Sequence, residues 1–265
     1  MASTSAVPSV ELNNGVAMPQ LGFGTWNVGG HEVELALEVG YRSFDTATIY
    51  GNEDEVGRAI AASGIPRDEL FVATKVWEED QGYDSTLRAF EASRTRLGLD
   101  IIDLYLIHWP APKLDRYIET WQALESLLAD GAVRAIGVSN FQIEHLERLA
   151  RETDTVPALN QIELNPYLPQ TERREYHAAH GIATEAWAPL DRAGRLLREP
   201  VITELAERHG RTPAQIVLRW SIQLGNIVIP RSSSRERIEE NFDVFGFELA
   251  ADDVGRIMAL GGDSV

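Results

Sequence analysis

Ile102-Asp103-Leu104-Tyr105-Leu106-Ile107-His108 is a run of mostly apolar side chains that ends on a histidine. Its length and near-continuous apolar character are typical of a strand covered on both faces, as in a parallel sheet. Seven further segments of this kind lie along the chain: Leu21–Gly24, Tyr41–Asp45, Phe71–Lys75, Arg134–Ser139, Ala158–Ile162, Ile182–Trp187 and Asn226–Pro230. The sequence therefore predicts eight strands.

Stretches with helical spacing of apolar residues separate these strands. In the clearest, Asp115–Asp130, the side chains of Trp121, Leu124 and Leu128 fall on one stripe. The others are predicted around His31–Val39 and over Asn52–Ser63, Asp84–Leu97, Gln142–Arg151, Gln170–Ala179, Glu199–His209, Thr212–Leu224, Ser234–Val244 and Ala251–Leu260. Eight strands alternating with helices over about 250 residues predict an α/β protein with a (β/α)8 TIM barrel. An open, doubly wound sheet is the structural alternative.

The two ends of the chain add to this pattern. Val10–Leu12 followed by Asn13–Gly15 predicts a hairpin before the first barrel strand. Helices over Glu199–His209 and Thr212–Leu224 would both lie between the seventh and eighth strands, so extra helices are expected near the C-terminus. No internal repeat, low-complexity tract or linker is visible, and we expect residues 1–265 to form a single domain.

Composition excludes several classes of function. Acidic residues number 41 against 24 basic ones, and this negative charge disfavours nucleic acid and anionic membranes as partners. The absence of cysteine excludes disulfides, thiolate metal sites and a cysteine nucleophile. No apolar run is long enough to span a bilayer, and Met1–Val10 lacks the pattern of a signal peptide. We expect a cytoplasmic, monomeric protein.

Polar side chains gather where the predicted strands end. Asp45, Lys75 and His108 end the second, third and fourth strands, and Tyr50 follows shortly after Asp45. Each alone has a structural explanation, such as a turn cap or a hydrogen-bonded core histidine. However, the carboxyl ends of barrel strands meet on one face, where barrel enzymes carry their active sites. Lys75 is also one of only two lysines in the chain, the other being Lys113.

These four side chains can work together as an acid. The phenol of Tyr50 has an ordinary pKa of about 10, which a neighbouring Lys75 ammonium would lower by favouring the phenolate. A buried Asp45 would keep that ammonium charged, and His108 could hydrogen-bond a substrate oxygen and orient it toward the phenol. Such a set can protonate an oxygen that is becoming an alkoxide, as hydride addition to a carbonyl requires.

Several ordered motifs resemble those of the aldo-keto reductase family, and they extend over nearly the whole chain. They are Gly40-Tyr41-Arg42-Ser43-Phe44-Asp45-Thr46-Ala47-Thr48-Ile49-Tyr50-Gly51-Asn52-Glu53, Thr74-Lys75-Val76-Trp77, Asp103–Pro110, Gly137-Val138-Ser139-Asn140-Phe141, Asn160–Tyr167 and Ile229-Pro230-Arg231-Ser232. The 2,5-diketo-gluconate reductase-like bacterial branch is the most similar. The resemblance implies an NADPH-dependent reductase of aldehydes, ketones or keto-sugars. In it Tyr50 is the general acid, Lys75 and Asp45 tune its pKa, and His108 orients the small-molecule carbonyl substrate.

The resemblance also implies how NADPH is held, across the strand ends and without a Rossmann fold. At the nicotinamide end, Trp187 is expected to stack on the ring, with Ser139, Asn140 and Gln161 at its carboxamide. Leu190 is expected by the diphosphate and Thr25 beside the cofactor. At the adenosine end, the 2′-phosphate is expected to lie among Arg231, Ser232, Ser233 and Arg237, and the adenine at Glu240 and Asn241. Two guanidinium groups beside a helix start suit a phosphate dianion. Without the preceding strand, Arg237 would instead be interpreted as part of a solvated helix face.

Three tryptophans, Trp26, Trp77 and Trp109, are expected to line the substrate mouth together with His108. Core packing is the alternative for all three, and it is the better explanation for Trp121 and Trp220, which lie inside predicted helices. We expect no metal site, because His177 and His180 have no third ligand nearby in the sequence. Gly22–Asn27 lacks the third glycine of a dinucleotide fingerprint and is interpreted as the end of the first strand.

The sequence departs from the family pattern in three places. The segment between Trp26 and Asp45 is shorter than usual by about one helical turn, which leaves the role of Trp26 open. Arg231 occupies a position where many members have lysine, and little chain follows Leu260. The short tail predicts an open site with broad substrate selectivity.

Two other functions remain open from the residues alone. Lys75 could form a Schiff base in an aldolase-like barrel. Alternatively, the chain could be a cofactor-binding sensor or subunit with little catalysis.

Overall fold

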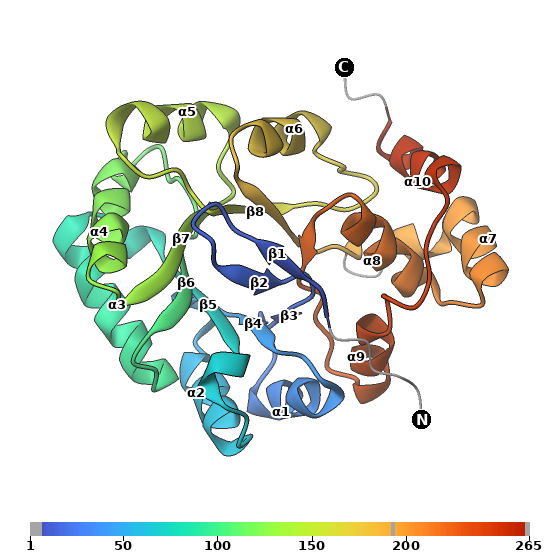
Figure 1. Cartoon of the computed structure of the whole chain (residues 1–265), viewed down its shortest axis with the longest axis horizontal. Helices are drawn as coiled ribbons and strands as arrows, with labels where there is room; N and C mark the ends of the chain where they lie inside the picture. Colours follow the sequence, from blue (N-terminus) through green and yellow to red (C-terminus); the bar gives the residue numbers. More distant parts are fainter. Residues whose placement is uncertain (1–6, 192–193, 263–265) are drawn as a thin grey trace.

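Eight parallel strands form the sheet at the centre of the molecule (Figure 1). The structure is a computed structural model that describes residues 7–191 and 194–262. In sheet order the strands are β3 (Phe23–Gly24), β4 (Ser43–Asp45), β5 (Phe71–Val76), β6 (Ile102–Ile107), β7 (Val133–Ser139), β8 (Leu159–Glu163), β9 (Ala183–Trp187) and β10 (Ile227–Val228). The order in the sheet follows the order in the sequence without a reversal. A doubly wound sheet requires such a reversal, so that alternative is wrong, and the predicted parallel α/β architecture is confirmed.

Hydrogen bonds also join the segments that contain the first and last strands of the sheet, β3 and β10. Leu21 forms a parallel bridge with Val228, and the N–H of Gly22 donates to the carbonyl oxygen of Val228 at 2.9 Å. The N–H of Gly24 donates to the carbonyl oxygen of Pro230 at 3.1 Å. β3 and β10 are nevertheless shorter than predicted, with two residues each. One reason is that proline has no N–H, so Pro230 cannot donate to a neighbouring strand.

Helices surround the sheet (Figure 1). They are α1 (Gly30–Val39), α2 (Glu53–Ala62), α3 (Tyr83–Leu97), α4 (Tyr117–Ala129), α5 (Ile143–Glu152), α6 (Thr171–Ala179), α7 (Pro200–His209), α8 (Pro213–Gln223), α9 (Arg235–Phe242) and α10 (Ala251–Met258). Two helices follow β9 and two follow β10, so helices in excess of one per strand lie near the C-terminus, as predicted. Within the described residues, no helix is both long and apolar enough to cross a membrane.

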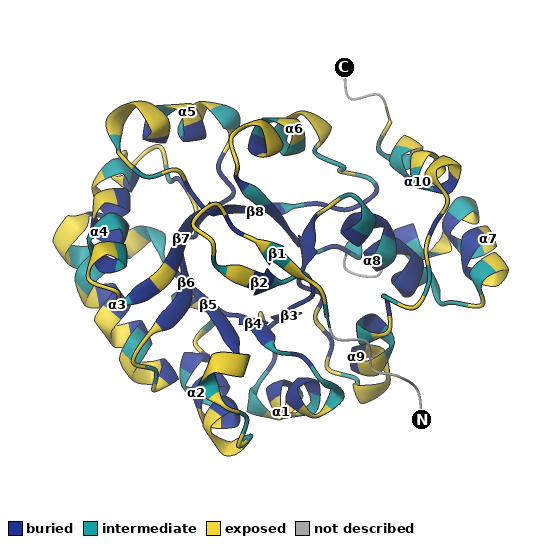
Figure 2. Ribbon diagram, in the orientation of Figure 1, coloured by how far each residue is buried: buried dark blue, intermediate teal, exposed yellow. Residues whose placement is uncertain are grey.

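Local sequence signals explain where several of these helices begin. At the start of α8, the hydroxyl of Thr212 accepts a hydrogen bond from the N–H of Gln215, and Pro213 occupies the first helical position. This is the start that the Thr-Pro pair predicts, because proline lacks the N–H that would have no partner there. Outward-facing helix residues are exposed and inward-facing ones buried, as Figure 2 shows. Trp121 and Trp220 are both fully buried, in agreement with their interpretation as core residues.

A hairpin covers the amino-terminal end of the strands. β1 (Ser9–Glu11) and β2 (Ala17–Pro19) pair in antiparallel fashion, and Gly15 in their turn has a φ of 81°. Figure 1 shows the hairpin lying across the ring of strands. Its buried Leu12 and Met18 belong to one apolar cluster with residues near the starts of strands, among them Phe71 and Leu159. The opposite, carboxyl end of the strands is therefore the end left for a binding site.

Gly137 lets β7 pack closely against its neighbours beneath the carboxyl ends. A Cβ at this position would lie 2.6 Å from the carbonyl oxygen of Leu159 and 2.7 Å from the side chain of Leu106. We expect Gly137→Ala to lower the free energy of unfolding by about 1–3 kcal/mol through overpacking, measured by urea denaturation. Gly255→Ala is the matched control: a Cβ there meets nothing within 4 Å in α10, so this variant should be neutral or slightly stabilised. Equal stability of the two variants would contradict the close packing.

Candidate active site

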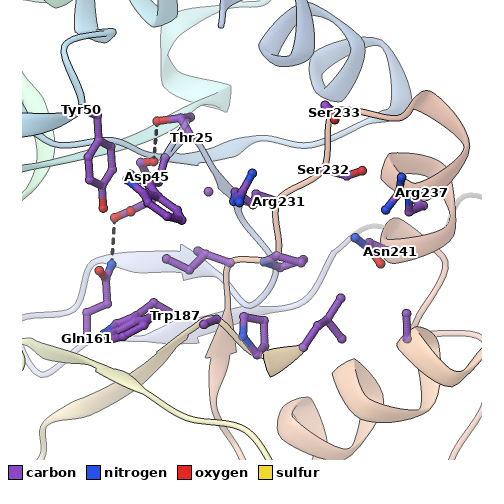
Figure 3. Close-up of a pocket in the computed structure, with 18 of the residues that line it drawn as sticks. Thr25, Asp45, Tyr50, Gln161, Trp187, Arg231, Ser232, Ser233, Arg237 and Asn241 are labelled. Carbon is purple, nitrogen blue, oxygen red and sulfur yellow. Dashed lines mark hydrogen bonds between the residues drawn. The ribbon is translucent and has the colours of Figure 1, made fainter. Parts of the chain in front are cut away.

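A pocket of about 430 Å³ opens at the carboxyl ends of the strands (Figure 3). The predicted site residues that line it are Thr25, Trp26, Asp45, Tyr50, His108, Trp109, Ser139, Asn140, Gln161, Trp187, Leu190, Arg231, Ser232, Ser233, Arg237, Glu240 and Asn241. Parallel strands bring their carboxyl ends together, which explains why positions so far apart in the sequence meet here. Lys75 and Trp77 are not among the lining residues.

Lys75 lies behind the pocket wall in an ion pair. Its ammonium donates to Oδ1 of Asp45 at 2.6 Å and to the carbonyl oxygen of Thr46 at 2.9 Å, and its side chain is fully buried. Burial by itself lowers the pKa of Lys75, but the charges of Asp45 and Tyr50 outweigh it and raise the pKa above the ordinary value. Lys75 is therefore charged at neutral pH.

Tyr50 lies next to this ion pair at the end of the short 3-10 helix η1 (Thr48–Tyr50). The Lys75 ammonium is 5.2 Å from the centre of the Tyr50 ring. The hydroxyl of Thr48 donates to the carbonyl oxygen of Lys75 at 3.0 Å, which attaches η1 to β5. Burial raises the pKa of Tyr50, and Lys75 lowers it. Lys75 thus acts in the expected direction, but burial is the larger effect, so the pKa of Tyr50 is raised overall.

His108 presents a neutral imidazole beside Tyr50. The two rings meet edge to face with centres 5.8 Å apart, and the ring of Trp77 also packs edge to face with His108, with centres 5.1 Å apart. Burial, aided by the charge of Lys75, lowers the pKa of His108 to about 3. A neutral imidazole can donate one hydrogen bond to a bound oxygen, and His108 retains this capacity throughout the usual pH range. Trp77 therefore supports His108 and does not itself line the pocket, contrary to the prediction.

Polar groups beside Trp187 are held in place by one another. The indole N–H of Trp187 donates to Oδ1 of Asn140 at 2.9 Å, and Nδ2 of Asn140 donates to the hydroxyl of Ser139 at 3.0 Å. Ser139 in turn donates to the carbonyl oxygen of Gln161 at 3.0 Å. Asn140 has a φ of 62°, a left-handed conformation that asparagine adopts more readily than most residues. The result is a fixed aromatic face with amide and hydroxyl groups at its edge.

Glu185, which was not predicted from the sequence, lies behind the pocket lining in contact with Gln161. Nε2 of Gln161 donates to Oε2 of Glu185 at 2.6 Å and to Oδ2 of Asp45 at 2.8 Å. Glu185 is fully buried, and burial followed by the charge of Asp45 raises its pKa to about 8. A signal for it was present: Glu185 precedes Trp187 by two positions on one strand, so both side chains face the same side of the sheet.

The far end of the pocket is basic, as Figure 3 shows by the positions of Arg231 and Arg237 relative to Tyr50. Arg237 projects from the first turn of α9, where the helix dipole also favours an anion. Its neighbour Arg235 is engaged elsewhere, in ion pairs with Glu38 at 2.8 Å and Glu239 at 2.9 Å. The two arginines of this turn are therefore distinct, and Arg237 is the one that lines the pocket.

Trp26 lines the pocket despite the short segment that follows it. The Arg231 guanidinium stacks over its ring at 5.0 Å, and half of the tryptophan surface is exposed. α1 occupies Gly30–Val39, close to its predicted position, so the shorter segment does not remove Trp26 from the pocket.

The candidate metal ligands His177 and His180 both lie among the described His, Asp and Glu side chains. Across residues 7–191 and 194–262, no three His, Asp or Glu side chains are placed so that they could hold a metal ion. The two ring nitrogens of His177 are instead 3.0 Å from Nδ2 of Asn160 and 2.9 Å from the hydroxyl of Thr184. His177 is thus a hydrogen-bonded core residue.

Comparisons with known proteins agree on one family. The family model described as "Aldo/keto reductase family" matches residues 20–261. A glyoxal reductase of Bacillus subtilis is 51% identical over 98% of this chain and 95% of its own length. A crystal structure of an aldo/keto reductase from Brucella melitensis superposes with a TM-score of 0.93 at 52% identity, covering 96% of this chain and 99% of that one. A mutant of the protein Gox0644, crystallised in complex with NADPH, has a TM-score of 0.92 at 47% identity, covering 97% and 94%.

Proposed function

Since the chain belongs to the aldo/keto reductase family, we propose that it is an NADPH-dependent oxidoreductase that reduces aldehydes, ketones or keto-sugars to alcohols. One observation carries this proposal. The buried pair of Lys75 and Asp45, 2.6 Å apart, lies behind Tyr50, which faces a pocket beside the neutral ring of His108. A phenol, an ammonium and a neutral imidazole around one oxygen suit the protonation of that oxygen as it becomes an alkoxide, which carbonyl reduction requires.

The chain's own residues would orient the carbonyl and supply its proton. When bound, NADPH supplies the hydride that reduces the carbonyl carbon. His108 donates a hydrogen bond to the carbonyl oxygen and holds it near the Tyr50 hydroxyl. As negative charge develops on that oxygen, Tyr50 transfers its proton to it, and the Lys75 ammonium stabilises the phenolate that is left. Asp45 keeps Lys75 charged through this step.

The pocket has the donors and acceptors that NADPH needs. Trp187 offers a face for the nicotinamide ring, and the ordered side chains of Ser139, Asn140 and Gln161 lie within reach of its carboxamide. At the other end, Arg231, Ser232, Ser233 and Arg237 would surround the 2′-phosphate, with Glu240 and Asn241 at the adenine and Leu190 and Thr25 between the two ends. The relative crystallised in complex with NADPH supports the choice of cofactor.

Cofactor choice can be tested at Arg237. We expect Arg237→Ala to weaken NADPH binding about 10- to 100-fold and to leave NADH binding nearly unchanged, because only NADPH carries the 2′-phosphate. Cofactor fluorescence titration measures both affinities. Arg235→Ala, which removes a guanidinium already paired with two glutamates, is the control and should preserve NADPH binding. An equal loss for NADPH and NADH would refute the assigned phosphate site.

The geometry disfavours Lys75 as a Schiff-base nucleophile. Its ammonium is fully buried, bonded to Asp45 and Thr46, and kept protonated, whereas a nucleophilic amine must lose its proton and reach the substrate. Borohydride trapping with a carbonyl substrate should therefore leave the chain unlabelled. A sensor with little catalysis would be recognised by tight NADPH binding without turnover.

Several finer assignments belong to the same proposal. The hydrogen bonds that Val228 forms with Gln20 and Gly22 support a closed (β/α)8 barrel, and the one eight-stranded sheet at its centre supports a single domain over residues 1–265. Membership of the 2,5-diketo-gluconate reductase-like branch, a monomeric state and a cytoplasmic location stay predictions. The test of the function is NADPH oxidation with a panel of aldehydes, ketones and keto-sugars. The panel includes glyoxal, because the Bacillus subtilis relative is named a glyoxal reductase. A lack of turnover across this panel would contradict the proposal.

A further inference from the structure

Glu185 is a buried carboxyl group that the proposed reaction does not use. It lies on β9 two positions before Trp187, and its side chain faces the inside of the sheet. Its Oε2 accepts a hydrogen bond from Nε2 of Gln161 at 2.6 Å, while the same nitrogen donates to Oδ2 of Asp45 at 2.8 Å. One amide nitrogen thus connects two carboxyl groups.

These two hydrogen bonds determine the orientation of the Gln161 side-chain amide. An amide nitrogen has two protons, and here Asp45 and Glu185 each accept one. The amide oxygen, Oε1, is then the group of Gln161 available to a ligand in the pocket that this residue lines. The terminal torsion of glutamine is soft, so loss of either acceptor would free the amide to rotate.

Glu185 also adds an acidic group beside the pair formed by Asp45 and Lys75. The titratable groups that act on it are Asp45 from β4 and Lys75 from β5, and its own charge acts on Tyr50 of η1. On β10, the residue paired with Glu185 is the apolar Ile227. Among the described residues, Oε1 of Glu185 has no hydrogen-bond partner, so burying it as an anion is unfavourable.

We propose that Glu185 is a positioning residue of the active site, which orients the Gln161 amide toward the nicotinamide end of the cofactor and adds an acidic group next to the pair of Asp45 and Lys75 that flanks Tyr50. The inference rests on the proposed function, because it takes the pocket to hold NADPH. Glu185 does not line the pocket, so it acts only through Gln161 and Tyr50, which do. When ionised, it raises the pKa of Tyr50 by repulsion, opposite to the effect of Lys75.

Glu185→Gln separates charge from hydrogen bonding, since the new amide oxygen can still accept from Gln161 but cannot ionise. We expect the pKa of Tyr50 to fall by roughly 0.3 to 1 unit, while NADPH affinity stays near the wild-type value. The titration is followed without cofactor by NMR of ¹³C-labelled tyrosine, with Tyr50→Phe identifying the signal. The pH profile of alcohol oxidation should shift in the same direction. Glu163→Gln, on the adjacent strand, is the control and should not shift it.

Glu185→Ala removes the acceptor altogether. We expect NADPH affinity to fall about 3- to 10-fold, as for the loss of one hydrogen bond that orients a ligand group, with the same downward shift of the Tyr50 pKa. If this variant fails to fold, the titration of Glu185→Gln decides. The proposal is wrong if Glu185→Gln titrates like the wild type, or if folded Glu185→Ala binds NADPH as tightly as the wild type. If the wild type itself binds no NADPH, the proposed function fails, whereas the cofactor-free titration still measures the effect of Glu185.

Discussion

Tyr50→Phe is expected to lower kcat for carbonyl reduction about 10²- to 10⁴-fold while NADPH binding is unchanged. The substitution removes only the hydroxyl group, so the ring keeps its edge-to-face contact with His108 and its place beside Lys75. The developing alkoxide then has no positioned proton donor. Steady-state kinetics and cofactor fluorescence titration measure the two quantities separately.

The control for this substitution is Tyr83→Phe. Tyr83 is an exposed tyrosine whose hydroxyl lies 2.9 Å from that of Ser126, away from the pocket, so its loss should leave kcat unaffected. If Tyr50→Phe kept full turnover, another group would have to protonate the substrate, and the proposed role of Tyr50 would be abandoned.

Lys75→Met is expected to reduce both stability and activity. The substitution leaves the Asp45 carboxylate buried without its cation, which typically costs about 3–5 kcal/mol of the free energy of unfolding. It also removes the charge that stabilises the Tyr50 phenolate, so kcat should fall together with stability. Urea denaturation at constant m-value measures the first effect, and steady-state kinetics the second.

Two further variants separate these effects. In the double variant Lys75→Met with Asp45→Asn, the unpaired carboxylate is gone, so most of the lost stability should return while activity stays low. Lys113→Met removes the other lysine of the chain, which is exposed, and should change neither quantity. Recovery of activity in the double variant would show that Lys75 serves only to neutralise Asp45.

Much of the fold and of the pocket could be predicted from residue pattern. The run ending at His108 and the strands ending at Asp45 and Lys75 predicted side chains on one face, because carboxyl ends of parallel strands meet there. The structure brings these residues together around Tyr50. The predicted phosphate-binding residues Arg231 and Arg237 also line this pocket. Periodicity and strand-end chemistry were sufficient for the residues around Tyr50, whereas the phosphate-binding residues were predicted from the resemblance to the family.

Other properties depend on contacts between distant strands. Glu185 gains its role from Gln161 and Asp45, on two other strands, and no local pattern in β9 announces such a pairing. Trp77 is outside the pocket lining and packs against the ring of His108, a contact between the ends of two different strands.

The sequence alone determined which chemical groups stand at the strand ends, while the residues by themselves left more than one reaction open. Only the tertiary structure decided how burial and neighbouring charges together set the pKa values of those groups. Lys75 lowers the pKa of Tyr50, as its neighbouring position predicts. Burial raises the same pKa by more than Lys75 lowers it, so the pKa is raised overall. The physical reason is that desolvation and charge act through space, so their sum depends on how closely other strands surround a side chain.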